Sequence, residues 1–241
     1  MPWFADWFNS PYYHILYKAH DEIESKRFIV NLIDYLKLQK GEKVLDLACG
    51  KGRHAIFLHA LGMEVTGIDL AERNIKFAKK FETKRLQFIK GDMREHFFIN
   101  AFDLVVNLFT SFGYFENVED DYKTLNAVNG SLKPNGLFVL DFFNANVVTQ
   151  SIQPQIIKTV DGINFNISKE VKDGFIFKEI RFTDNGNEYF FKERVRCYTL
   201  NDFKLLFEKC GFKLEKTFGN YLFEDFNAAS SERLIMLCRK V

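Results

Sequence analysis

The sequence has few cysteines, and their spacing does not suggest a metal site or a disulfide framework. Its four cysteines are Cys49, Cys197, Cys210 and Cys238; no two form a CxxC pair, and no histidine stands at a ligand spacing from them. This pattern disfavours both disulfides and structural zinc. We therefore expect no metal in the functional site.

Long apolar runs and an excess of one charge are also missing. No segment approaches the run of about 18 apolar residues that a membrane span requires, and the N-terminal MPWFADWF lacks the basic-then-apolar order of a signal peptide. Lys and Arg number 33 against 32 Asp and Glu, a net charge of +1, so no overall field attracts nucleic acid or an acidic membrane. We expect a soluble, cytoplasmic monomer or homodimer with a small-molecule substrate and no membrane or nucleic-acid partner.

What the sequence does contain is a β-loop-α-β unit in residues 43–70, KVLDLACGKGRHAIFLHALGMEVTGIDL. The apolar run Val44–Ala48 predicts a buried strand, and a second strand ends at Asp69. Between them, Gly50 and Gly52 form a turn into a helix, where glycine lets a ligand approach the backbone. An acid about 20 residues beyond such a turn is typical of ribose binding. The unit therefore predicts an adenosine-type cofactor.

An acid inside the first strand narrows the choice of cofactor. Asp46 lies four residues before the first glycine, where an anion disfavours a pyrophosphate but suits a ligand with an ammonium and a sulfonium. Ala55 stands where a dinucleotide fingerprint would have its closing glycine. The pattern DxxCGxGR resembles motif I of the class I S-adenosylmethionine-dependent methyltransferases, with Asp69 as the acidic end of their second strand. The resemblance covers residues 43–142 and 199–241, and it implies S-adenosylmethionine as the cofactor.

The resemblance also implies roles for residues at later strand ends. In this family an acid after the third strand binds the adenine amino group and the next backbone N–H meets a ring nitrogen; Asp92 and Met93 hold these places. The loop after the fourth strand is expected near the methyl donor. The residues that we expect to bind the cofactor are Asp46, Ala48, Cys49, Gly50, Gly52, Asp69, Leu70, Asp92, Met93, Asn107 and Phe109.

The order of the predicted elements is that of an α/β protein. Four strands lie before residue 109, and further strands are predicted at 137–142, 212–218 and 234–239, with helical segments between them. We expect a Rossmann-like, seven-stranded, mostly parallel sheet with helices on both faces, ending in a hairpin.

Residues 162–197 have a different pattern, because apolar and polar residues alternate there. Lys172-Asp173-Gly174 and Asp184-Asn185-Gly186 are hairpin turns. They predict a three-stranded antiparallel insertion after the fifth strand, which either walls the substrate pocket or braces the fold. The chain thus divides, within one domain, into an N-terminal segment and helix (1–42), a methyltransferase core (43–146 and 198–241) and the insertion (147–197).

The first residues are unusually aromatic for a chain end, with Trp3, Phe4, Trp7, Phe8, Tyr12, Tyr13 and Tyr17. Such a segment must bury its rings somewhere. It either packs on the outside of the domain or folds over the cofactor cleft as a lid.

Methyl transfer depends on alignment and the exclusion of water, so a dedicated base is not obligatory. Tyr114 and His20 are the candidate proton acceptors. The candidate substrate-binding residues are Tyr13, Tyr17, Phe112, Tyr114 and Asn144. We expect in-line methylation of a nitrogen or oxygen nucleophile of a small molecule.

Three other functions are weighed against this one. An NAD-dependent oxidoreductase is disfavoured by Asp46, by the missing closing glycine and by the insertion where a second half-fold should be. A non-catalytic protein that kept the fold is another hypothesis. A base-modifying methyltransferase is the third, and it is disfavoured because such enzymes usually carry a [DNS]PP[YFW] signature where residues 107–110 of this chain read NLFT.

Overall fold

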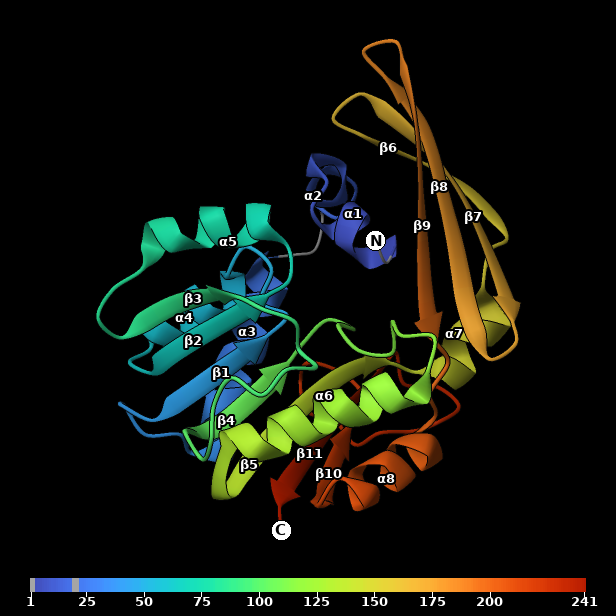
Figure 1. Cartoon of the computed structure of the whole chain (residues 1–241). Helices are drawn as coiled ribbons and strands as arrows, with labels where there is room; N and C mark the ends of the chain where they lie inside the picture. The colour runs from blue at the N-terminus through green and yellow to red at the C-terminus, as the bar shows by residue number, and fades with distance from the viewer. Residues whose placement is uncertain (1–2, 19–21) are drawn as a thin grey trace.

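The computed structural model describes residues 3–18 and 22–241, which form a seven-stranded and a four-stranded sheet (Figure 1). The larger sheet has the order β10-β11-β5-β4-β1-β2-β3. Only β11 breaks its parallel arrangement, because it runs antiparallel to both β5 and β10. The predicted Rossmann-like sheet with a C-terminal hairpin is confirmed. Its strands are β1 (Lys43–Leu47), β2 (Glu64–Asp69), β3 (Leu86–Lys90), β4 (Phe102–Asn107), β5 (Leu132–Phe143), β10 (Phe212–Phe218) and β11 (Arg233–Lys240).

Successive residues of the central strands point to opposite faces of this sheet, and helices cover both. Val44 and Leu104 belong to the core under α3, α4 and α5, whereas Leu45 and Val105 belong to the core under α6 and α8. Both faces are therefore apolar, which explains the near-continuous apolar runs in the sequence. The helices are α3 (Glu22–Leu36), α4 (Arg53–Ala60), α5 (Glu72–Ala78) with the 3-10 turn η1 (Lys79–Phe81), α6 (Val118–Ser131) and α8 (Leu200–Lys209).

The insertion has four antiparallel strands, so the prediction of three was wrong by one. After helix α7 (Ala145–Ser151), the strands are β6 (Gln155–Val160), β7 (Ile163–Lys172), β8 (Phe175–Asp184) and β9 (Asn187–Arg196). The missed strand, β6, lies at the sheet edge and alternates exposed with half-buried residues, so it has no fully buried face to give a clear apolar pattern. It joins β7 through a tight Asp161-Gly162 turn with positive φ at both residues.

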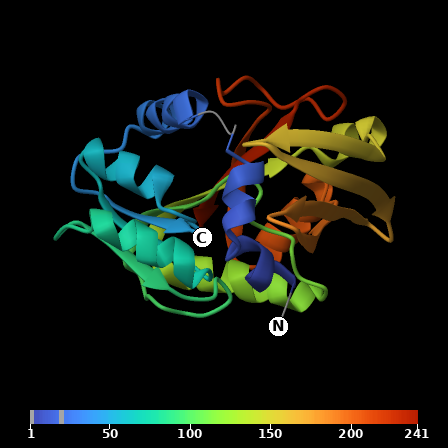
Figure 2. The ribbon, with the colours of Figure 1, turned by 90° about the horizontal axis from the view of Figure 1, so that it is seen from above.

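Two short helices, α1 (Trp3–Phe8) and α2 (Pro11–Leu16), form an N-terminal cover made of residues 3–18. Both views place it between the insertion sheet and the α5 side of the core (Figures 1 and 2). Trp7 and Leu16 are buried against apolar residues of β7 and β8. One side of the segment thus packs on the insertion sheet, and its other side faces the ends of the core strands. The two arrangements considered for it, packing on the domain and covering the cleft, therefore occur together. The predicted site residue His20 lies outside the described residues.

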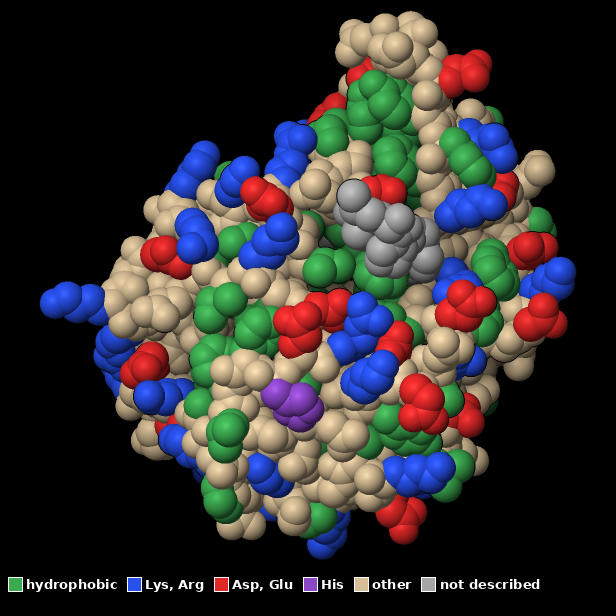
Figure 3. Space-filling model, viewed as in Figure 1, with side chains coloured by type: hydrophobic (Ala, Val, Ile, Leu, Met, Phe, Trp, Pro, Cys, Tyr) green, Lys and Arg blue, Asp and Glu red, His purple; other side chains and the backbone are tan. Residues whose placement is uncertain are grey.

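The surface has no large region of a single charge on the face seen in Figure 3, where basic and acidic side chains are interspersed. This agrees with the net charge of +1. Within residues 3–18 and 22–241, no helix combines the length and the apolarity needed to cross a membrane.

Candidate functional site

The turn after β1 exposes its backbone at one glycine and packs tightly at the other. Ala48, Gly50 and Gly52 all have positive φ, at 59°, 56° and 81°. A Cβ on Gly50 would meet nothing within 4 Å, whereas a Cβ on Gly52 would lie 2.6 Å from the ring of Phe88. Gly50 therefore leaves room for a ligand against the chain, and Gly52 lets the turn pack on the core.

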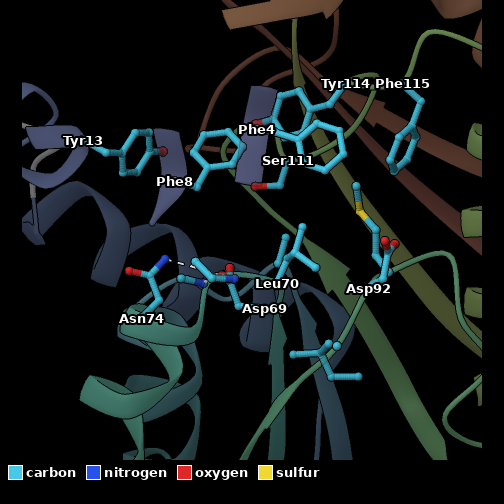
Figure 4. A pocket seen from close by; sticks show the side chains of 16 residues that line it. Phe4, Phe8, Tyr13, Asp69, Leu70, Asn74, Asp92, Ser111, Tyr114 and Phe115 are labelled. Atoms are coloured by element: carbon cyan, nitrogen blue, oxygen red, sulfur yellow. Dashed lines mark hydrogen bonds between the residues drawn. The ribbon is translucent and has the colours of Figure 1, made fainter. Parts of the chain in front are cut away.

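The carboxylate of Asp69 holds this turn beside the start of α5. It accepts hydrogen bonds of 2.8 Å from the backbone N–H groups of Gly50 and Ala71, and a longer one of 3.4 Å from Nδ2 of Asn74. Burial raises the pKa of Asp69, while these hydrogen bonds oppose the shift. Figure 4 shows Asp69, Leu70 and Asn74 on one side of a cavity.

This first cavity has a volume of about 100 Å³ and lies at the carboxyl ends of the core strands. In open α/β sheets ligands bind at that edge. Six of the residues predicted to bind the cofactor line it, namely Ala48, Gly50, Asp69, Leu70, Asp92 and Met93. The sequence prediction did not include the aromatic residues Phe4, Phe8 and Phe115 that close its other side.

Asp46, Cys49, Gly52 and Asn107 were predicted to bind the cofactor, but the structure places them behind the cavity wall. Asp46 is buried and accepts a 3.1 Å hydrogen bond from the N–H of Ala55. Burial raises the pKa of Asp46 from 3.8 to about 7. Gly52 has no side chain, and the other three side chains are short and belong to the strands and the turn, so the four residues shape the wall instead of lining the cavity.

Asn107 shows how such a residue shapes the wall. It is buried at the end of β4, and its Nδ2 donates to the carbonyl oxygens of Leu47 at 3.1 Å and Ser111 at 3.3 Å. These bonds join the end of β1 to the loop after β4. Ser111 itself lines the first cavity.

Asp92 is held by an arginine that the sequence prediction missed. Nη2 of Arg94 lies 2.6 Å from Asp92, and its Nη1 lies 2.8 Å from Asp120 at the start of α6. Burial opposes ionisation of Asp92, but the hydrogen bonds and charge of Arg94 hold the pKa of Asp92 below its usual value. The guanidinium also lies 4.7 Å from the ring centroid of Phe115. Asp92 therefore meets the cavity as a fixed carboxylate.

The N-terminal cover closes the first cavity opposite Asp69. Figure 4 shows Phe4, Phe8 and Tyr13 facing Asp69 and Asn74 across it. Nε2 of His14 lies 2.6 Å from Oδ1 of Asn74, so a contact of the cover reaches the Asp69 network.

A second cavity of about 480 Å³ adjoins the first, and Phe8, Tyr13 and Tyr114 line both. Tyr17, predicted to bind substrate, lines the second cavity, as does Phe109 from the cofactor prediction. The cavity lies between the loop after β4, the N-terminal cover and the insertion sheet. Its charged lining residues are Lys169, Lys178, Glu193 and Arg233.

Two residues predicted to bind substrate do not reach either cavity, and this corrects the prediction. Phe112 is fully buried in the core, against the rings of Tyr198 and Phe203, because an apolar ring is most stable there. Asn144 is also buried, and its amide donates to the carbonyls of Ala228 and Ser231 at 3.0 and 2.9 Å. Both side chains are therefore committed to packing the fold.

The loop after β4 is strained and is held by a buried ion pair. Phe109 and Thr110 are consecutive non-glycine residues with φ of 57° and 62°. The carboxylate of Asp141 accepts from the N–H of Phe109 at 2.8 Å, and its backbone carbonyl accepts from the N–H of Thr110 at 3.0 Å. Arg233 binds the same carboxylate at 2.7 Å and the Thr110 hydroxyl at 3.0 Å. The pair thus fixes the wall of the second cavity.

Tyr114 stands where the two cavities meet, and its phenol keeps its proton at neutral pH. Its hydroxyl donates to the carbonyl oxygen of Thr110. Burial raises the pKa of Tyr114 well above its ordinary value, and the nearby Tyr13 and Glu193 add to the shift. The predicted role as a proton acceptor therefore has no support from this environment.

Within the part of the chain that the structure describes, no cluster of three or more His, Cys, Asp or Glu side chains is placed to hold a metal ion.

The charged residues of the insertion were missed, although the sequence contains a signal for two of them. Lys169 falls on the inward positions of β7, where Ile163, Phe165 and Ile167 precede it at intervals of two. A lysine in such a series interrupts an apolar face. Pairing through the Asp173-Gly174 turn then places Lys178 opposite it.

Comparison with known proteins relates the chain to methyltransferases. The family profile described as a methyltransferase domain matches residues 44–136. The "Putative methyltransferase YqeM" of Bacillus subtilis (strain 168) is 31% identical over 212 residues, which cover 84% of this chain and 85% of that protein.

Solved structures share the fold over nearly the whole chain. An S-adenosylmethionine-dependent methyltransferase from Clostridium acetobutylicum ATCC 824 has a TM-score of 0.80 at 20% identity, covering 95% of this chain and 96% of that one. CalS10 from Micromonospora echinaspora, described as an amino pentose methyltransferase with SAM bound, has a TM-score of 0.72 at 17% identity, covering 96% and 98%. At these identities the structures establish likeness of fold.

Proposed function

The chain belongs to the S-adenosylmethionine-dependent methyltransferases, and we propose that it methylates a nitrogen or oxygen nucleophile of a small molecule. The observation that carries the proposal is the pair of adjoining cavities that share Phe8, Tyr13 and Tyr114. The first is lined by acids at strand ends, and the second is a larger space of about 480 Å³. Family membership confirms the predicted cofactor and sets aside the NAD-dependent alternative.

The residues around the first cavity fit S-adenosylmethionine. Asp69 retains lone pairs for ribose hydroxyls, Gly50 leaves open space against the backbone, and Asp92 is a fixed carboxylate for an amino group. The thioether and methylene groups of Met93 supply an apolar wall. When bound, the cofactor supplies an electrophilic methyl group on a positively charged sulfur.

The chain's own residues contribute alignment and the exclusion of water. Phe4, Phe8 and Phe115 close the first cavity with apolar rings. The Asp141–Arg233 pair fixes the strained loop that faces the acceptor. Alignment of this kind can lower a barrier by roughly 7–11 kcal/mol, so no residue need act as a dedicated base.

Two features support a small acceptor. The second cavity lies between the N-terminal cover and the insertion, and its volume of about 480 Å³ is in the range of small-molecule sites. CalS10, which has the same fold, is described as acting on an amino pentose.

The test is turnover with S-adenosylmethionine over a panel of amines, phenols and hydroxy acids, followed by S-adenosylhomocysteine release and by the mass of the methylated product. We expect at least one small acceptor to be methylated, and no release without an acceptor. Binding of S-adenosylhomocysteine without turnover over the whole panel would favour the non-catalytic hypothesis. Methylation of added nucleic acid or protein instead would contradict the acceptor class.

A further inference from the structure

The inward face of the insertion sheet carries one charged row between two apolar rows. Strand register aligns Lys169 of β7, Lys178 of β8 and Glu193 of β9 across the sheet. The flanking rows on the same face are Ile167, Ile180 and Phe191 on one side and Val171, Ile176 and Val195 on the other. All three charged residues line the second cavity. A charged row at this position loses solvation free energy unless its charges are balanced.

Two of the three charges balance each other. Nζ of Lys178 lies 2.5 Å from Oε2 of Glu193. The other oxygen of Glu193 accepts 2.6 Å hydrogen bonds from Nε1 of Trp7 and the hydroxyl of Tyr17. Burial opposes ionisation of Glu193, but the charge of Lys178 and these hydrogen bonds hold its pKa below the usual value. This pair is therefore ionised and neutral as a whole.

Lys169 is left without a counter-ion. Among residues 3–18 and 22–241, no hydrogen bond or ion pair involves its ammonium group, which is half-buried. Burial lowers the pKa of Lys169, and the charges of Lys178 and Lys158 add to the shift, whereas the charge of Glu193, which is already paired with Lys178, opposes it. Like charges directly opposite in a sheet are destabilising.

The remaining cation of the cavity, Arg233, does not change this balance. Asp141 neutralises it at 2.7 Å. The charged residues that line the second cavity, with Asp141 behind them, therefore leave one positive charge unbalanced.

Building on the proposed function, we propose that the acceptor carries a carboxylate, and that this carboxylate binds Lys169. The acceptor would extend from Lys169 toward Tyr114, where the second cavity meets the first. A monoanion neutralises the single unbalanced charge. A phosphate dianion would replace it with a negative charge that nothing else in the cavity offsets.

The test compares two probes of the same shape, benzoate and benzamide, by calorimetric titration of protein loaded with S-adenosylhomocysteine. We expect wild type to bind benzoate at least tenfold more tightly than benzamide. Lys169→Met should abolish this preference while leaving benzamide and S-adenosylhomocysteine binding unchanged. Lys169→Arg should retain it, because the charge is kept. Lys172→Met, the same change at an exposed position of the same strand, is the matched control and should behave as wild type.

Three results would overturn the proposal: equal affinity of wild type for the two probes, a preference that survives in Lys169→Met, or tighter binding of phenylphosphonate than of benzoate, which would assign the site to a phosphoryl group. The titration is repeated without S-adenosylhomocysteine. If that ligand does not bind, the proposed function fails, whereas the comparison of benzoate with benzamide still decides whether the carboxylate site exists.

Discussion

The two cavities of this protein share three aromatic residues but are built in different ways. The polar wall of the first comes from the ends of β1, β2 and β3 and the short loops that follow them. The second joins α1 and α2, near the start of the chain, to β7, β8 and β9, well over 100 residues later. The first is held by backbone hydrogen bonds to Asp69, and the second by side-chain contacts around Glu193.

This difference separates a cavity that the whole core supports from a cavity that a few residues of the cover and the insertion determine. The proposed cofactor site is built on strand ends and is supported by the whole core, so it can be kept while other parts change. The proposed acceptor site lies between the N-terminal cover and the insertion, so its chemistry can change through a few residues without disturbing that core. Changes to the two sites should therefore have separable effects.

The largest effect is expected at Glu193, on the acceptor side. Glu193→Ala leaves Lys178 without a counter-ion and removes the acceptor for Trp7 and Tyr17. Breaking a fully buried pair costs about 3–5 kcal/mol. Because 20% of the Lys178 side chain and 12% of the Glu193 side chain are exposed, we expect a loss at the lower end, about 3 kcal/mol. Urea unfolding of the variant and wild type measures it.

A double variant is the control for this prediction. Lys178→Met with Glu193→Leu makes the charged row resemble its apolar neighbours, and replacement of a buried pair by apolar residues is often neutral. It should recover most of the lost stability. A loss below about 1 kcal/mol in Glu193→Ala, the range of exposed ion pairs, would mean that the row is solvated and that the two cavities are not held differently.

The next largest effect is expected at Asp69, on the cofactor side. Asp69→Ala removes the acceptor for two backbone N–H groups and, in the proposed function, for the ribose hydroxyls. One hydrogen bond to a charged group contributes about 1.5–3 kcal/mol. We therefore expect S-adenosylhomocysteine affinity to fall about 100-fold, or about 2.7 kcal/mol, as measured by calorimetry.

Asp103→Ala is the matched control for Asp69→Ala. Asp103 accepts from the N–H of Lys43 and pairs with Lys133 at the start of β4, the opposite edge of the sheet. It should leave the affinity unchanged. An equal loss in both variants would attribute the effect to the fold and not to the cavity.

A smaller, pH-dependent effect is expected at Asp46, whose pKa is raised by burial from 3.8 to about 7. Between these values the native state holds a proton that the unfolded chain releases, so the free energy of unfolding falls as pH rises from about 4 to about 7. Asp46→Asn cannot titrate. Between pH 4 and pH 8, wild type should lose at least about 1.4 kcal/mol more stability than the variant, the equivalent of one pKa unit. Parallel stability curves in urea would contradict this account.

The same contrast explains which features could be predicted from the sequence. Asp69 and Gly50 could be found because a strand, a turn and a second strand place them together within about 20 residues. The seven-stranded sheet followed from apolar runs that reflect burial on both faces. These signals are local, so one sequence is enough to detect them.

The acceptor side depends on contacts between distant segments, which local patterns do not determine. Nothing near Trp7 indicates that its ring N–H meets Glu193. Phe112 was assigned to substrate because it follows a strand end, but an aromatic residue in a loop can equally turn back into the core. Edge strand β6 was missed because neither of its faces is fully buried, so its apolar alternation is weak.

The smallest effect is expected at Tyr114, where the two cavities meet. Its hydroxyl donates to Thr110 and its pKa is raised by burial, so the phenol positions the loop and does not accept a proton. A net hydrogen bond contributes about 0.5–1.5 kcal/mol, so Tyr114→Phe should lower kcat by about tenfold or less and leave the pH profile unchanged.

Steady-state kinetics on the acceptor found by turnover measures the effect of Tyr114→Phe, with Tyr122→Phe, away from both cavities, as the matched control. General-base catalysis contributes about 10²–10⁴-fold. A loss in that range, with one limb of the pH profile removed, would restore Tyr114 as the proton acceptor. It would also place a catalytic residue at the boundary between the two cavities. A small loss would instead mean that Tyr114 contributes only to alignment.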